Sequence, residues 1–195
     1  MNINTRGIRI SLFPLFLILA LCSIGMSAAD TTVTVSPSTQ DVDVGQPFTI
    51  TIDVTPGEAI DKVQVDLTYN QNLVTATSIA DGGMFANFVS DPIDNTNGKI
   101  ESICGFNLGG TTTTNPGTLA TLTFTANTVG QSPLDLVDVI VLNGVTSVPN
   151  NPQSGSVTVN PVATTDTIVK VSPSTQDVDV GQPFTITIDV TPGEA

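Results

Sequence analysis

The residues best suited to chemistry lie in one short stretch, 91–99, which reads DPIDNTNGK. Asp91, Asp94, Asn95 and Asn97 offer carboxylate and amide oxygens, the hard ligands that Ca²⁺ prefers. Their spacing does not match that of a known calcium-binding loop. We therefore predict no resident cofactor, and calcium is the alternative that this stretch keeps open.

Two pairs of carboxylates raise the question of glycoside hydrolysis, which uses two Asp or Glu side chains. Asp91 and Asp94 share the stretch above, and Asp41 and Asp43 flank a short apolar alternation. Nothing marks a pocket that would shift the pKa of a carboxyl group, so we interpret both pairs as solvated charges. The chain has no histidine, which excludes Ser-His-Asp and Cys-His catalysis and any imidazole metal site. We predict no catalytic residues and no enzyme.

The N-terminal residues 1–29 have the pattern of a secretory signal peptide. Arg6 and Arg9 precede an apolar run over 10–25, and small residues at 27–29 suit cleavage before Asp30. An uncleaved membrane anchor is the alternative. Cleavage also removes Cys22, which leaves Cys104 as a single cysteine that we expect to be buried and unreactive; a reactive or intermolecular thiol is the alternative. We therefore expect a secreted, extracellular or cell-surface protein.

The chain beyond residue 29 is strongly acidic. It carries all 18 Asp and Glu residues against only three lysines, Lys62, Lys99 and Lys170, a formal charge of −15. Nucleic acids and anionic membranes attract basic surfaces, so we expect neither as a partner and no membrane insertion of the mature chain.

One stretch of sequence occurs twice. Residues 35–59, VSPSTQDVDVGQPFTITIDVTPGEA, return unchanged at 171–195, which is 136 residues later. That interval is the size of a domain and longer than a solenoid repeat. We therefore expect a domain over 30–161, a linker over 162–167, and the truncated start of a second copy of the domain over 168–195. Strand exchange of the second copy with a neighbouring chain is a further hypothesis.

Apolar residues alternate with polar ones along most of the 30–161 region, and no window has a helical period. In 48–54, apolar side chains occupy every second position, and 62–69 and 118–126 repeat this pattern. The run 134–142 is almost continuously apolar, which predicts a strand covered on both faces. We predict about nine strands in an all-β sandwich, since the uneven connections favour two packed sheets over one closed sheet.

The order of these strands resembles that of cohesin domains, the dockerin-binding modules of cellulosome scaffoldins. The resemblance rests on GQPFTITIDV (45–54), KVQVDLTYNQNLV (62–74), NGKIESICGF (97–106), NPGTLATLTFTA (115–126) and a closing GSVTV (155–159). It implies a nine-stranded jelly-roll sandwich and a dockerin-bearing protein as partner, in the sphere of polysaccharide degradation. It further implies that one flat sheet face binds this partner.

Carried onto this sequence, the resemblance places the partner-binding residues on the outward side of three strands. Ile103 and Leu119 are the apolar positions on otherwise polar faces, which suits the centre of a small interface. The full set is Lys62, Gln64, Asp66, Thr68, Glu101, Ile103, Leu119, Thr121 and Thr123.

Two other functions stay open. A sandwich of the same superfamily could bind carbohydrate directly, although the chain has no tryptophan and its one tyrosine, Tyr69, is expected to point inward. Alternatively, the repeat and the acidic surface suit a structural or adhesive tandem repeat of a cell-surface protein.

Overall fold

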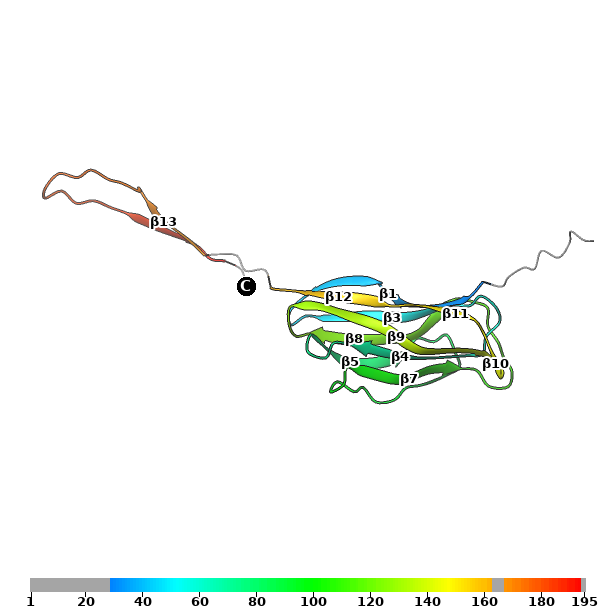
Figure 1. Ribbon diagram of the computed structural model, residues 1–195. Coiled ribbons are helices and arrows are strands. Elements are labelled where there is room, and N and C mark those ends of the chain that lie inside the picture. The colour runs from blue at the N-terminus through cyan, green and yellow to red at the C-terminus, as the bar shows by residue number, and fades with distance from the viewer. Residues whose placement is uncertain (1–28, 163–166, 194–195) are drawn as a thin grey trace, which may run out of the picture.

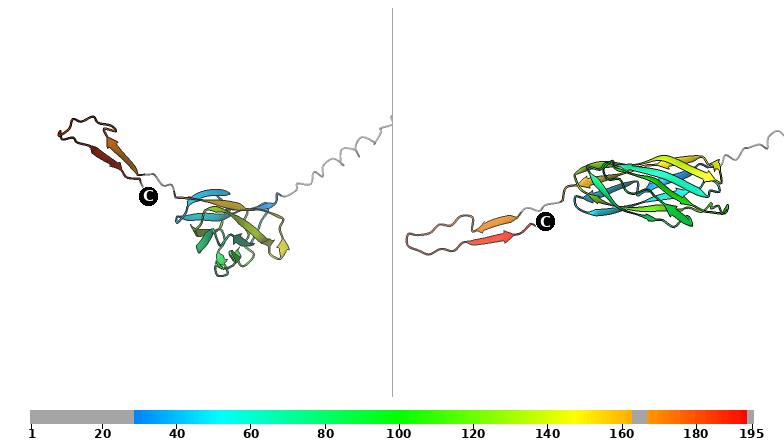
Figure 2. Two further views of the ribbon diagram at one scale, coloured as in Figure 1. Left: turned by 60° about the vertical axis from the view of Figure 1, so that its left-hand side comes forward. Right: turned by 90° about the horizontal axis from the view of Figure 1, so that it is seen from below.

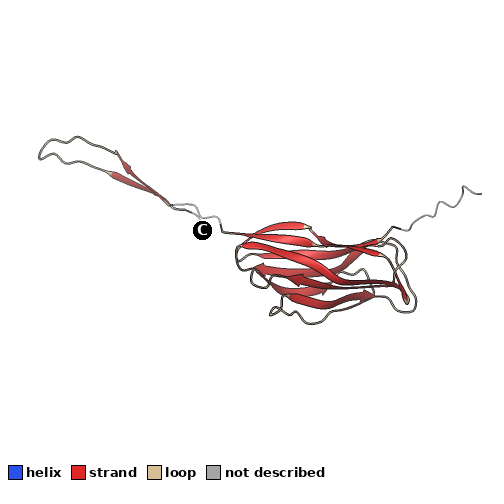
Figure 3. Ribbon diagram, in the orientation of Figure 1, coloured by secondary structure: helices blue, strands red, loops and turns tan. Residues whose placement is uncertain are grey.

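The computed structural model describes residues 29–162 and 167–193 and shows two β-sheets packed face to face (Figures 1 and 3). We call the five-stranded sheet, with strand order β11-β1-β3-β8-β5, sheet A. Sheet B has the order β2-β12-β9-β4-β7-β6, with β10 paired to β9. The prediction of an all-β sandwich is confirmed, and no residue within the two described ranges is helical.

Sheet A forms largely from strands in which apolar residues alternate with threonine and other polar residues. Its shortest strand, which reads NNPQ, has no such pattern. Its members are β1 (Thr31–Ser36), β3 (Pro47–Thr55), β5 (Val74–Asp81), β8 (Gly117–Ala126) and β11 (Asn150–Gln153). Along β3, Phe48, Ile50, Ile52 and Val54 are all buried, as their alternation predicts. The outward side of this sheet is rich in threonine.

Sheet B contains the longest strand of the molecule. Its members are β2 (Thr39–Asp43), β4 (Lys62–Tyr69), β6 (Asn87–Val89), β7 (Lys99–Phe106), β9 (Gly130–Asn143), β10 (Thr146–Ser147) and β12 (Gly155–Asn160). Strand β4 lies in the middle of the sheet, where it pairs antiparallel with β7 on one side and β9 on the other. This position makes β4 the centre of the outer surface of sheet B.

The first and last runs of the domain each cross from one sheet to the other. Strands β1 and β2 are separated by two residues and lie in sheets A and B. Strands β11 and β12 are separated by one residue and also lie in sheets A and B. β1 pairs parallel with β11, and β2 pairs parallel with β12. The sandwich has twelve strands, β1–β12, where the sequence predicted about nine. The short strands β10 (TS) and β11 (NNPQ) have no apolar alternation that would have predicted them.

The core lies between the sheets and includes three aromatic rings in contact. Phe124 stacks on Phe48 with ring centroids 5.3 Å apart, and the Tyr69 ring meets Phe124 edge-on at 5.2 Å. Tyr69 is inward, as predicted, and its hydroxyl donates a hydrogen bond of 2.7 Å to Asn95 Oδ1. Burial raises the pKa of Tyr69 to about 12, with the nearby Asp94 carboxylate as a second cause.

The second copy of the repeated sequence forms a hairpin of β13 (Ile168–Ser172) and β14 (Thr187–Thr191). Figure 2 shows this hairpin apart from the sandwich in both views. The predicted leader, 1–29, lies almost entirely outside the described residues, as does most of the predicted linker, 162–167. Nowhere in the described ranges is there a helix long and apolar enough to cross a membrane.

Candidate functional site

The four predicted binding residues of β4 lie together on the outer surface of sheet B. Val63, Val65, Leu67 and Tyr69 are buried, so the alternation turns the other four side chains outward. The outward residues are Lys62, Gln64, Asp66 and Thr68. For this strand, the sequence predicted the orientation correctly.

The prediction for Ile103 in β7 is wrong, because a β-bulge reverses the alternation. Ser102 has a left-handed backbone with φ 55°, and the register shifts so that two residues of β7 oppose Asp66. Asp66 Oδ1 accepts a hydrogen bond of 2.8 Å from the Ser102 amide, which holds the bulge. Ile103 is consequently 0% exposed and belongs to the core, while Glu101 stays outward, as predicted.

The three predicted residues of β8 do not belong to the same surface, because β8 is a strand of sheet A. Thr121 and Thr123 point outward, but on the opposite side of the sandwich from β4. Leu119 is 1% exposed, since a register shift beside Ile52 and Asp53 turns it inward. Leu119 lies in the core against Gly105, where a Cβ added to the glycine would come within 2.7 Å of Leu119 Cδ1.

The apolar run in β9 has a different cause from the one predicted. A second bulge, at Asp138 with φ 50°, shifts the register against β4. Val137 faces outward by plain alternation with the buried Leu136, and the bulge turns Ile140 to the same side. They are 37% and 43% exposed, so this strand is not covered on both faces. The almost continuously apolar run 134–142 marked these residues in the sequence, but we interpreted it there as a strand covered by a second layer.

Strand pairing arranges these side chains in two rows across β6, β7, β4 and β9. We call this surface the outer B face. One row is Val89, Cys104, Gln64 and Ile140, and the next is Asn87, Phe106, Lys62 and Leu142. Val89 is 52% exposed and Ile140 is 43% exposed. The first row therefore begins and ends with an exposed apolar side chain, and Cys104 and the polar Gln64 lie between them.

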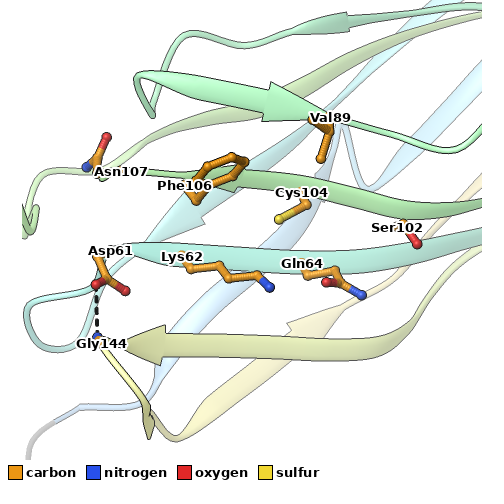
Figure 4. Close-up of a pocket in the computed structure, with 9 residues that line it drawn as sticks. All are labelled: Asp61, Lys62, Gln64, Val89, Ser102, Cys104, Phe106, Asn107 and Gly144. Atoms are coloured by element: carbon orange, nitrogen blue, oxygen red, sulfur yellow. Dashed lines mark hydrogen bonds between the residues drawn. The ribbon is translucent and has the colours of Figure 1, made fainter. Parts of the chain in front are cut away.

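A hollow of about 390 Å³ lies on the outer B face at the start of β4. Figure 4 shows Phe106 and Cys104 on β7 facing Lys62 and Gln64 on β4 across it, with Val89 above. At its end, Asp61 Oδ2 accepts a hydrogen bond of 2.9 Å from the Gly144 amide, which ties β4 to the turn after β9. The hollow therefore has a mixed lining: Val89, Cys104 and Phe106 beside the polar Gln64, Ser102 and Asn107, with Lys62 and Asp61 as its charged residues.

Cys104 is buried, as predicted, but it lies beneath the outer B face and not between the sheets. The bulge at Ser102 places it outward, and neighbouring side chains leave it 5% exposed. Burial raises the pKa of its thiol, and the charge of Lys62 opposes that shift only in part. Cys104 is a free thiol, and its environment favours the neutral, less nucleophilic form.

The stretch 91–99 uses its oxygens to hold its own backbone. Asp94 accepts hydrogen bonds from the amides of Thr96 and Asn97 and from Asn97 Nδ2, and these bonds lower the pKa of the Asp94 carboxyl group. Asn95 turns toward the sandwich, where it bonds both backbone groups of Ala76. Within 29–162 and 167–193, no three His, Cys, Asp or Glu side chains gather as metal ligands.

The fold and the outer B face together define a β-sandwich module with one broad, partly apolar sheet surface. A family model described as the cohesin domain matches residues 33–171. The chain belongs to the cohesin domain family. No sequence among the curated proteins matches it significantly.

Several solved structures share this fold. A cohesin–dockerin complex from Clostridium thermocellum, Coh-OlpA-Doc918, is 12% identical with a TM-score of 0.58, covering 68% of this chain and 100% of that chain. CaCohA2 from Clostridium acetobutylicum is 19% identical, with a TM-score of 0.56, and the match covers 68% and 92%. A non-cellulosomal cohesin from the archaeon Archaeoglobus fulgidus is 15% identical, with a TM-score of 0.56 and the same coverage. At these identities, the likeness shows the fold.

Proposed function

We propose that this chain is a non-catalytic binding module that captures a dockerin-bearing protein on the outer B face. The observation that carries the proposal is that three large apolar side chains, those of Val89, Val137 and Ile140, are exposed on this face. Membership of the cohesin family supports the class of partner, and a similar structure from Clostridium thermocellum is a cohesin–dockerin complex.

The outer B face has the composition of a protein interface. Apolar side chains beside polar ones are typical of surfaces that bind proteins. Lys99 and Glu101 form an exposed ion pair of 2.8 Å at the edge of the face, where charges steer association more than they hold a complex. We infer that Ile140, Gln64 and the hollow at Cys104 form the centre of the contact, where most binding energy usually resides.

The setting of this activity is also a proposal. The leader pattern over 1–29 supports export, and the acidic chain suits a soluble extracellular module. A role in polysaccharide degradation is supported by the family resemblance. Because one similar structure is a non-cellulosomal cohesin, we do not tie the proposal to a cellulosome.

Calorimetric titration of the full chain, after leader cleavage, with a panel of dockerin modules tests the proposal. We expect saturable binding to at least one of them in the presence of Ca²⁺. Ile140→Asp should weaken that complex about 30-fold or more, which corresponds to roughly 2 kcal/mol at an interface centre. Val129→Asp is the matched control, because Val129 is similarly exposed at 51% but lies outside the outer B face.

Two results would contradict the proposed function. If no dockerin in a broad panel binds, the class of partner is wrong. If Thr121→Asp and Thr123→Asp weaken binding while Ile140→Asp does not, the contact lies on sheet A. Retention of the chain on insoluble polysaccharide, without dockerin binding, would favour the carbohydrate-binding alternative.

A further inference from the structure

Both lysines of the sandwich lie on the outer B face. Residues 30–161 contain thirteen Asp and Glu residues and only two lysines, Lys62 and Lys99. Lys62 is the first residue of β4 and Lys99 is the first residue of β7, and both are half-buried. The positive charge of an otherwise acidic domain therefore lies on the face that also exposes Val89 and Ile140.

The two lysines differ in their partners. Lys99 Nζ lies 2.8 Å from Glu101 Oε1, so its charge is neutralised within the chain. Lys62 forms no ion pair with any described residue. Figure 4 shows its side chain extended along β4, away from Asp61 and toward Gln64. Within the described part of the chain, the Lys62 ammonium therefore faces the hollow without a counter-charge.

The nearby carboxylates of β4 and of the turn before it are bonded to backbone amides. Asp61, which lines the hollow, accepts a hydrogen bond of 2.9 Å from the Gly144 amide. Asp66 accepts one of 2.8 Å from the Ser102 amide. These bonds direct both carboxylates to backbone groups, and neither carboxylate pairs with Lys62.

The hollow presents hydrogen-bond donors beside apolar side chains. Together with the Lys62 ammonium, the Gln64 amide and the Ser102 hydroxyl can donate to a bound oxygen. The apolar part of the lining is Val89, Cys104 and Phe106. Burial raises the pKa of the Cys104 thiol, which keeps the thiol neutral, so Cys104 is no counter-charge for Lys62.

Burial of this surface under a partner sets a condition on that partner. An ammonium group that loses its water without gaining a counter-charge is costly to bury. An apolar or basic surface over the hollow would leave Lys62 in that state, whereas a carboxylate would form a charge-assisted hydrogen bond with it. Charge complementarity therefore favours an acidic group, and the apolar part of the lining favours one that is carried on methylene groups.

We propose that the hollow receives an acidic side chain of the partner, with its carboxylate on Lys62 and Gln64 and its methylene groups against Phe106. Because the hollow lies at the centre of the proposed dockerin contact, this assignment rests on the proposed function. Lys62 then determines specificity: a partner with a neutral or basic residue at this point is disfavoured, because it leaves Lys62 buried and unpaired.

A small carboxylate tests the site without a dockerin. The probe is hexanoate, which has a carboxylate on an apolar stem, and hexylammonium is the control of opposite charge. Amide NMR spectra of the full chain, after leader cleavage, should show saturable shifts with hexanoate at Lys62, Gln64 and Cys104, with a Kd in the millimolar range.

Substitution of lysine separates the site from the net charge of the chain. Lys62→Gln should weaken hexanoate binding about fivefold or more, because it removes a charge-assisted hydrogen bond. Lys170→Gln is the matched control, since it removes the same charge from β13, outside the hollow.

A second measurement uses the dockerin that binds most tightly in the calorimetric panel. Each of its Asp and Glu residues is replaced in turn by the corresponding amide. We expect one of these substitutions to weaken binding to the wild-type chain about tenfold or more and to leave binding to the Lys62→Gln chain unchanged, which identifies the carboxylate that pairs with Lys62.

Four outcomes would overturn the proposal. Three concern the probe: hexanoate shifts none of these amides, hexylammonium shifts them equally, or Lys62→Gln binds hexanoate as well as wild type does. The fourth is a dockerin that binds wild type and Lys62→Gln equally, which would leave the proposed function intact. Hexanoate binding that depends on Lys62, with no dockerin binding at all, would support the carboxylate site and refute the proposed class of partner.

Discussion

Ile103 and Ile140 provide a direct test of the bulges that shape the outer B face. Both are isoleucines in neighbouring regions of sheet B, but Ile103 is 0% exposed and Ile140 is 43% exposed. Replacement by alanine removes the same three carbon atoms at each position. Because only Ile103 is buried, the free energy of unfolding should fall much more at Ile103 than at Ile140.

The magnitude follows from burial. Loss of three buried carbons at Ile103 removes about 2.4 kcal/mol of transfer free energy, at about 0.8 kcal/mol per carbon. The cavity adds to this, so we expect a total of about 2–5 kcal/mol. At Ile140 no cavity forms and part of the side chain is already in water, so we expect about 1 kcal/mol or less.

The assay is urea unfolding of the full chain with each substitution, supported by thermal unfolding. For a domain of this size, 1 kcal/mol corresponds to roughly 3–5 °C in Tm, so Ile103→Ala should lower Tm by about 6–25 °C. Ile103→Val is the graded control, with an expected loss of about 0.5–1.5 kcal/mol. Equal losses for Ile103→Ala and Ile140→Ala, or the reverse order, would refute the assigned orientations.

Three further predictions concern single residues. Burial raises the pKa of Tyr69 from 10.0 to about 12, so the folded state favours the neutral phenol. The contribution of the neutral phenol to the free energy of unfolding is complete below pH 10 and is lost as the pH rises through 12. Urea unfolding at pH 9–12 should show wild type losing on the order of 2 kcal/mol more than Tyr69→Phe, and parallel profiles would contradict this. Ser102→Val places a β-branched residue at φ 55° and should cost about 1–2 kcal/mol in urea unfolding, whereas Ser102→Gly should not; equal effects would remove the argument from backbone strain. Gly105→Ala would bring a Cβ within 2.7 Å of Leu119 Cδ1 and should lower Tm through about 1–3 kcal/mol of overpacking, which an unchanged Tm would disprove.

The repeated sequence shows which features of a strand pair depend on local sequence and which depend on the rest of the fold. Residues 168–172 and 187–191 pair in the register of β1 and β3 although no other strand among the described residues covers them. Register within a hairpin is thus a property of its own residues, since alternation and the connection between strands are local. Burial is not, because the same six apolar side chains are covered in one copy and exposed in the other.

The sequence alone determined the all-β class, the inward side of β3 and β4, and the outward set at Lys62, Gln64, Asp66 and Thr68. Period-two alternation carries that information, because each strand without a bulge keeps its faces from end to end. It also carried the family resemblance, which rests on the same apolar positions.

Only the tertiary structure decided which strands share a surface and where the alternation reverses. Ile103 and Leu119 are core residues because register shifts change the side on which they lie, and Thr121 and Thr123 face away from β4 because β8 pairs with β3. The bulge at Asp138 turns Ile140 to the same outward side as Val137, and no layer of the described chain covers either residue. Sheet membership and bulges depend on pairing between strands distant in sequence, and a single strand's pattern does not record its partners.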